Sequence, residues 1–276
     1  MRKIVFLDVD GTLIDYEGKL PASAREAVIK ARENGHLVYI CTGCSKSEIE
    51  AKHWDFELDG MIGGNGCYVE SQGKVVSHKT LTLEQCIHFV NWCNARGLVF
   101  RLECNDGMYI CPGYEEGSRR ARLEYARGKG AALSDDTIVP LNPAMIDGGN
   151  LIRDDVNKTG FVLKSYQDYL DAVEEFKGLK VGTWGGKGEA ALYGDVGVPN
   201  INKADAIHEL LAYLGADASD AIGFGDAKVD IPMFECCGYS VAMGNSGEET
   251  KEAADYVTAD INEDGLYLAF RHLGLI

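Results

Sequence analysis

Short apolar segments alternate with amphipathic segments at both ends of this chain, and this alternation narrows the possible folds more than any other feature. In the first third, apolar runs at residues 3–8, 37–41 and 60–62 predict strands, and residues 23–34 and 45–52 predict helices. Strands that are apolar along their whole length are buried on both faces. Strands joined through helices run parallel beneath those helices, so we expect an α/β fold with a doubly wound parallel sheet.

The last third of the chain repeats this alternation. A helix is predicted at residues 203–214, because Ile207, Leu210, Leu211 and Leu214 fall on one face. The spacing of Ser246 and Glu249 fits a capping box that opens a further helix. The other expected elements are strands at residues 221–224 and 239–242 and a final helix at residues 266–273.

The middle of the chain has a different pattern, in which predicted strands follow one another in pairs. The turn sequence Asn105-Asp106-Gly107 separates one such pair. Consecutive strands mixed with helices are typical of an α+β sheet that is open on one face. We therefore expect residues 83–190 to form an inserted domain and residues 1–82 and 191–276 to form the core. The elements expected in the insert are helices at 83–96, 115–127 and 167–177 and strands at 98–103, 108–111, 159–164, 181–184 and 190–193.

The charge balance excludes some classes of partner. The 276 residues include 27 Lys and Arg against 43 Asp and Glu, a formal net charge of −16. Nucleic acids and anionic membranes are bound through basic surfaces, so we expect neither as a partner. The apolar run after Lys3 ends at Asp8, too short for a signal peptide or a membrane span. Together with an odd number of cysteines, nine, this predicts a cytoplasmic protein with reduced thiols.

Two carboxylates follow the first predicted strand, in the sequence Asp8-Val-Asp10-Gly-Thr12. Residues two apart on a strand point the same way, so Asp8 and Asp10 can face one site. Ligands of open parallel sheets bind beyond the carboxyl ends of the strands, where this pair lies. Carboxylates held together repel each other unless a cation or a shared proton relieves them. A plain acidic surface turn is the simpler interpretation, but it does not predict a second pair elsewhere.

A second acidic pair does follow another predicted strand. Asp226 comes directly after residues 221–224, and Asp230 follows one helical turn later. Carboxylates that converge on one crevice make a hard-oxygen site of the kind that suits Mg²⁺. Asp230 is also placed to begin the next helix, because Ile231-Pro232 follows it, and both roles are compatible.

Three further residues indicate a place for phosphate. Thr42 and Gly43 end the second predicted strand and offer a hydroxyl and backbone N–H groups. Lys203 is the first residue of a predicted helix, where a cation is unfavourable next to the positive end of the helix dipole. A plain surface role is therefore less expected for Lys203 than for most lysines. A positive charge beside the carboxylates and a phosphoryl group would balance both.

These motifs, in this order, resemble the haloacid dehalogenase-like (HAD) superfamily. The large insert, Asn65-Gly66 and the tail from Val241 to Val257 are similar to its Cof-type branch, which carries a C2-type cap. The resemblance spans the chain, although its specific motifs lie in the core alone.

The resemblance implies a Mg²⁺-dependent phosphatase that works through an aspartyl-phosphate. Asp8 would be the nucleophile and Asp10 the general acid and base. Thr42, Gly43 and Lys203 would hold the phosphate. Mg²⁺ would be bound by Asp8, by the backbone carbonyl of Asp10, by Asp226 and, in or near the shell, by Asp230. The cap would close over the site and select a small phosphorylated substrate, with sugar phosphates as the expected class.

Two positions depart from the Cof-type pattern. Cys44 stands where the pattern usually has Arg, and Val229 where it usually has Asn. Neither position is the nucleophile or a carboxylate ligand, so these departures bear on the choice of substrate more than on the reaction. A phosphomutase, or a catalytically weak protein that binds a phosphorylated ligand, are the alternatives.

Other motifs are assigned to packing or to the surface. Cys41 and Cys44 have a C-x-x-C spacing, but Cys41 ends a predicted buried strand, which favours packing over redox chemistry. Arg119, Arg120 and Arg122 are interpreted as a solvated helix face, with a basic face toward an anionic substrate as the alternative.

Overall fold

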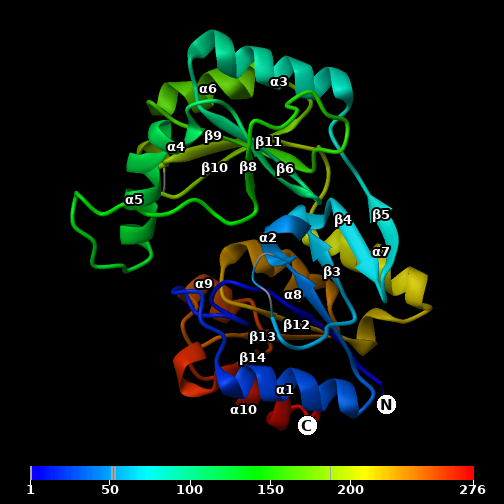
Figure 1. The fold of residues 1–276 in the computed structure, drawn as a ribbon. Helices are drawn as coiled ribbons and strands as arrows, with labels where there is room; N and C mark the ends of the chain where they lie inside the picture. Colours follow the sequence, from blue (N-terminus) through cyan, green and yellow to red (C-terminus); the bar gives the residue numbers. More distant parts are fainter. Residues whose placement is uncertain (1, 51, 53, 187) are drawn as a thin grey trace. The chain divides into compact units, whose positions relative to one another are not determined.

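The computed structural model of the chain describes residues 2–50, 52, 54–186 and 188–276. The chain divides into two compact units (Figure 1). The first unit comprises Met1–Cys44, Trp54–His78 and Ile201–Ile276, and the second comprises Ser45–His53 and Lys79–Asn200. The second unit therefore extends beyond the expected insert of residues 83–190 at both ends and also takes in helix α2 (Lys46–Glu50).

An open, mostly parallel sheet forms the centre of the first unit. Within the described residues it has eight strands in the order β14-β13-β12-β1-β2-β3-β4-β5. The strands from β14 to β3 pair in parallel, and β4 and β5 are added antiparallel. This sheet confirms the expected α/β fold. Its strands are β1 (Ile4–Leu7), β2 (Leu37–Cys41), β3 (Gly60–Gly63), β4 (Tyr68–Ser71), β5 (Lys74–His78), β12 (Ala221–Gly225), β13 (Tyr239–Ala242) and β14 (Tyr256–Val257).

Helices cover both faces of this sheet, which explains why its central strands are apolar throughout. Phe6 and Tyr39 pack against residues of α7 (Lys203–Leu214) and α8 (Ile231–Cys236). The other face carries α1 (Ala22–Glu33) and α10 (Gly265–His272), which lie side by side (Figure 1).

The second unit is built on a mainly antiparallel sheet. Its six strands, among the residues described, follow the order β10-β11-β9-β6-β7-β8, and β7 and β8 form the parallel pair. Side chains of α3, including Phe89, pack with Phe161 and with Ala172 of α6 into one apolar core. The elements are α3 (Leu83–Arg96), β6 (Phe100–Cys104), β7 (Gly107–Ile110), α4 (Tyr114–Gly117), α5 (Arg119–Gly128), β8 (Met145–Asp147), β9 (Lys158–Val162), α6 (Tyr166–Glu175), β10 (Lys180–Trp184) and β11 (Tyr193–Gly197).

Several local predictions were wrong. The strand expected at residues 190–193 begins instead at Tyr193, where β11 pairs with β9 and β10. The helix expected at residues 115–127 is interrupted at Ser118 and forms α4 and α5. Helix α9 (Glu248–Glu252) begins after Gly247 without a side-chain cap, so the expected capping box is absent there. Residue 51, within the helix expected at residues 45–52, lies outside the described residues.

Arg122 was placed on a solvated face by the sequence, and the structure buries it. Its guanidinium donates hydrogen bonds to the backbone carbonyls of Val139 and Glu115, at 3.1 and 3.0 Å. Arg122 therefore links the loop before β8 to α4. The spacing of residues along one helix cannot predict such contacts with a distant loop.

Among the described residues, no helix is both long enough and apolar enough to cross a bilayer.

Candidate active site

The end of strand β1 places two carboxylates in different surroundings. The Asp8 N–H donates to the carbonyl of Phe224 on β12 at 2.9 Å, which extends the strand pairing by one residue. The chain then turns, and the Gly11 N–H donates to the carbonyl of Ile14 at 2.7 Å. Gly11 has φ +96°, a left-handed conformation that glycine adopts without strain. As a result Asp8 is buried, whereas Asp10 is exposed.

The loop after strand β12 folds back onto Asp230. The backbone N–H groups of Asp226 and Ala227 donate to Asp230 Oδ2 at 3.2 and 3.1 Å. A Cβ atom at Gly225 would lie 2.6 Å from the Asp230 carboxyl carbon, so glycine is required for this approach. Asp230 directly precedes α8, at the position that the Ile231-Pro232 pair predicted, although its side chain caps no N–H group of this helix. The loop thus holds two acidic residues at the carboxyl end of a central strand.

Lys203 links the two strand ends. Its Nζ donates to Asp8 Oδ1 at 2.7 Å and to Asp230 Oδ1 at 2.6 Å, and the side chain is almost fully buried. The helix that carries it begins at Asn202, whose side chain accepts from the Asp205 N–H at 2.9 Å. The ammonium therefore bridges carboxylates that are far apart in the sequence.

The electrostatics of this cluster show a deficit of positive charge. Burial raises the pKa of Asp8 to about 8, Asp230 and Asp226 add to the rise, and Lys203 opposes it. Burial alone would lower the pKa of Lys203, but Asp8 and Asp230 outweigh it and hold this pKa above its usual value. With three carboxylates ionised beside one ammonium, the cluster would carry a net charge of about −2.

The carboxylates fit a divalent cation. Asp8, Asp226 and Asp230 each offer one oxygen, and these oxygens lie within 4.8 Å of one another in a buried setting. Hard oxygen ligands with excess negative charge suit Mg²⁺. The Asp10 side chain lies outside this group.

The turn after strand β2 carries the residues expected to bind phosphate. The Thr42 N–H donates to the Ile62 carbonyl at 2.9 Å, and the Thr42 hydroxyl accepts from the Cys44 N–H at 3.1 Å. A Cβ at Gly43 would lie 3.1 Å from Asn65 Oδ1. Cys44 also approaches the site, with its Sγ 3.8 Å from Asp10 Oδ2.

Two residues that hold Asp226 were missed by sequence reasoning. The Thr12 hydroxyl donates to Asp226 Oδ1 at 3.3 Å, and the Tyr16 hydroxyl donates to Asp226 Oδ2. Thr12 lies within the recognised motif and could have been found from it. Tyr16 lies in a loop without periodicity, so no pattern marked it.

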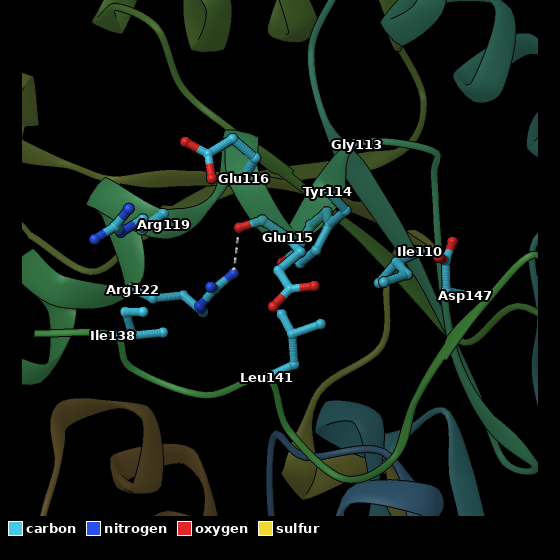
Figure 2. A pocket seen from close by; sticks show the side chains of 10 residues that line it. All are labelled: Ile110, Gly113, Tyr114, Glu115, Glu116, Arg119, Arg122, Ile138, Leu141 and Asp147. Carbon is cyan, nitrogen blue, oxygen red and sulfur yellow. Dashed lines mark hydrogen bonds between the residues drawn. The ribbon is translucent and has the colours of Figure 1, made fainter.

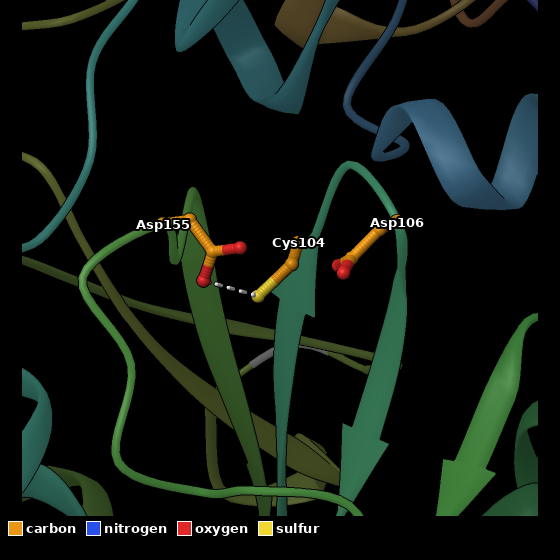
Figure 3. Close-up of side chains that lie close together, drawn as sticks. All are labelled: Cys104, Asp106 and Asp155. Carbon is orange, nitrogen blue, oxygen red and sulfur yellow. Dashed lines mark hydrogen bonds between the residues drawn. The ribbon is translucent and has the colours of Figure 1, made fainter.

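A second group of possible ligands, in the second unit, is partly balanced by an arginine. Cys104, Asp106 and Asp155 lie close together near the end of β6 (Figure 3). The guanidinium of Arg153 donates to Asp155 at 2.7 Å and to Asp106 at 3.1 Å. The cluster therefore has much less need of a metal than the buried one.

The second unit also holds a cavity of about 370 Å³ between α4, the start of α5 and the loop before β8 (Figure 2). Acidic and basic side chains line it together, among them Glu115, Arg119 and Asp147. It has no cluster of buried carboxylates, so the chemistry is assigned to the first unit.

The fold and this site define an α/β enzyme with an acidic centre at the carboxyl edge of its sheet. The sequence profile of the haloacid dehalogenase-like hydrolases matches residues 5–270. The chain belongs to this family, which confirms both the expected family and the expectation of a hydrolase.

Similar proteins span the whole chain. It is 24% identical to the 5-amino-6-(5-phospho-D-ribitylamino)uracil phosphatase YwtE of Bacillus subtilis (strain 168), over 96% of this chain and 95% of that protein. A hypothetical protein from Geobacillus kaustophilus is 26% identical, with a TM-score of 0.82 over 100% of both chains. A phosphatase from Bacteroides thetaiotaomicron is 25% identical, with a TM-score of 0.75 over 100% of this chain and 96% of that one.

Proposed function

We propose that this protein is a Mg²⁺-dependent phosphatase that hydrolyses small phosphorylated metabolites through an aspartyl-phosphate. The observation that carries the proposal is the meeting of Asp8, Asp226, Asp230 and Lys203 at one edge of the sheet. Among the relatives, two are named for a phosphate ester of a ribityl chain, a polyol related to sugars. A sugar phosphate or a similar polyol phosphate is therefore the proposed substrate class.

In this proposal, Asp8 and Asp10 divide the chemistry between them. The oxygen of Asp8 forms a bond to phosphorus as the bond to the leaving alcohol breaks. Asp10 gives that alcohol its proton, then takes a proton from the water that hydrolyses the aspartyl-phosphate. Their surroundings suit these roles, because Asp8 is fixed by Lys203 whereas Asp10 is exposed and can exchange protons with solvent.

The remaining residues hold the phosphate and the metal. Lys203, the Thr42 hydroxyl and the Gly43 N–H would balance the charge of the phosphate oxygens. Asp8, the Asp10 carbonyl and Asp226 would hold Mg²⁺, with Asp230 in or near the shell. When bound, Mg²⁺ supplies positive charge that reduces the repulsion between the Asp8 carboxylate and the phosphate.

We also propose that the second unit is the cap that selects the substrate, and that the protein works in the cytoplasm without nucleic acid or membrane partners. The first unit carries the proposed chemistry by itself. The second unit has its own core and a cavity lined by both charge signs, as expected of a separate recognition element.

The test is phosphate release from p-nitrophenyl phosphate and a panel of sugar and polyol phosphates, in Mg²⁺ and in EDTA. We expect release that requires Mg²⁺ and disappears in Asp8→Asn. Asp10→Asn should still form some phosphoryl-enzyme but turn over about 10²–10⁴-fold more slowly. Asp55→Asn is the matched control, because Asp55 forms an exposed ion pair with Arg25 elsewhere in the first unit.

Other outcomes would favour the alternatives. A phosphomutase would interconvert phosphate esters with a bisphosphate activator and release no free phosphate. Tight binding of a phosphorylated ligand without turnover would indicate a binding protein, which the Cys44 and Val229 departures make the second candidate. Near-normal turnover in Asp10→Asn would remove Asp10 as the acid and base.

A further inference from the structure

The loop between β1 and α1 presents one aromatic side chain to the acidic cluster. Tyr16 is 41% exposed, and its hydroxyl donates to Asp226 Oδ2. The other oxygen of the same carboxylate accepts from the Thr12 hydroxyl at 3.3 Å. Both oxygens of Asp226 are therefore held by hydroxyl donors from one loop.

The loop is built to keep Tyr16 in place. The Asp15 carboxylate accepts from the N–H groups of Glu17 and Lys19, at 2.9 and 2.8 Å, and the Gly18 N–H donates back to the Asp15 carbonyl at 2.9 Å. This Asx-type turn holds the backbone on either side of Tyr16.

The contact between Tyr16 and Asp226 requires glycine at position 11. A Cβ at Gly11 would lie 2.6 Å from the Asp226 carboxyl carbon and 2.7 Å from the Tyr16 hydroxyl oxygen. The Asn245 amide supports the same arrangement, because it donates to the Gly11 carbonyl at 2.8 Å. The loop after β1, the loop after β12 and the segment that carries Asn245 thus meet beside the Asp226 carboxylate.

We propose that Tyr16 is a positioning residue for the metal, which fixes the Asp226 carboxylate in the orientation that binds Mg²⁺. The inference rests on the proposed function. A carboxylate oxygen has two lone pairs, so Asp226 can accept from Tyr16 and still ligate the ion. Without the Tyr16 hydroxyl, the Asp226 carboxylate can rotate more freely in the metal-free protein. Binding of the ion then costs more conformational entropy, which weakens the affinity for Mg²⁺. Hydrogen bonds to ligating carboxylates commonly contribute 10–100-fold to metal affinity.

The test is calorimetric titration of the metal-free protein with Mg²⁺, without substrate. We expect Tyr16→Phe to weaken the Kd for Mg²⁺ by about 10–100-fold. Thermal unfolding in EDTA should be unchanged, because the half-exposed ring remains and only the hydroxyl is removed. Tyr213→Phe is the matched control, since Tyr213 is exposed on α7 of the same unit, and it should bind Mg²⁺ as the unsubstituted protein does.

A second measurement separates positioning from general damage. The Mg²⁺ concentration for half-maximal phosphate release should rise in Tyr16→Phe, while kcat at saturating Mg²⁺ stays within a few-fold. Equal or tighter Mg²⁺ binding by Tyr16→Phe would overturn the role of Tyr16 and leave the proposed function intact. Failure of the unsubstituted protein to bind Mg²⁺ would overturn both.

Discussion

The buried carboxylate of Asp8 makes the stability of the metal-free protein depend on pH. Its pKa of about 8 in the folded chain lies above the ordinary value of 3.8, so the folded state holds the proton more tightly. This contribution to stability is fully present below about pH 4 and is lost as the pH rises through about 8.

In EDTA, we therefore expect the free energy of unfolding of the unsubstituted protein to fall between pH 5 and pH 8, and Asp8→Asn to remove on the order of 3 kcal/mol of that fall. Urea denaturation at both pH values measures it, with Asp55→Asn as control. Parallel pH profiles for the unsubstituted and Asp8→Asn proteins would contradict the assignment.

Val229, one of the two departures from the Cof-type pattern, is 62% exposed in the turn between Asp226 and Asp230. Replacing an exposed apolar side chain changes stability by about 0.5 kcal/mol or less. We expect Val229→Asn to fold normally and to retain or raise Mg²⁺-dependent phosphate release. A large fall in Tm or in the rate of phosphate release would show that Val229 makes packing contacts that its 62% exposure does not predict.

At the scale of elements, strand β6 carries a buried ion pair on the face away from the apolar core. Arg101 contacts the Glu103 carboxylate at 2.8 Å, and both side chains are almost fully buried. Lys158 lies 3.3 Å from the other Glu103 oxygen. The guanidinium also lies over the Trp184 ring, 5.1 Å from its centroid.

Removing one partner of a buried pair leaves a charge without full compensation. We expect Arg101→Met to cost about 3 kcal/mol of unfolding free energy, because among the described residues Lys158 would then be the remaining ion-pair partner of Glu103. Lys177→Met, which breaks an ion pair with Glu174 that is more than 70% exposed, should cost less than about 1 kcal/mol. Comparable losses in the two variants, measured by urea denaturation, would argue against this account.

The helices and strands differ in how well the sequence predicts them. Strand β2 was predicted at its observed residues and β1 within one residue of each end, because strands buried on both faces read as continuous apolar runs. The hairpin of β4 and β5 was missed, since β5 is largely exposed and Val75 is 59% exposed. Strand β11 includes Gly194, Asp195 and Gly197, residues that favour turns, and tertiary pairing overrides that preference.

The candidate site was predictable where its residues follow such strands. Asp8 and Asp226 come directly after β1 and β12, and the structure brings both to one cluster with Asp230 and Lys203. Tyr16 was not predictable, because its contact with Asp226 depends on the path of a loop. The burial of Arg122 depends in the same way on carbonyls of a distant loop.

At the scale of the whole molecule, the net charge of −16 means that any cation stabilises the folded chain to some degree. A specific site adds a separate effect, because a ligand that binds only the folded state stabilises it by about 2.7 kcal/mol at 100 times its Kd. We therefore expect Mg²⁺ to raise Tm above the value reached in NaCl at matched ionic strength.

That difference should disappear in Asp226→Asn, which removes one of the three clustered carboxylates, and should persist in the Asp55→Asn control. Differential scanning calorimetry in EDTA, NaCl and MgCl₂ measures it. If NaCl at equal ionic strength reproduces the full shift, Mg²⁺ acts only by screening the surface charge. If the shift survives in Asp226→Asn, the ion binds elsewhere, and the acidic cluster at the sheet edge is then not the metal site.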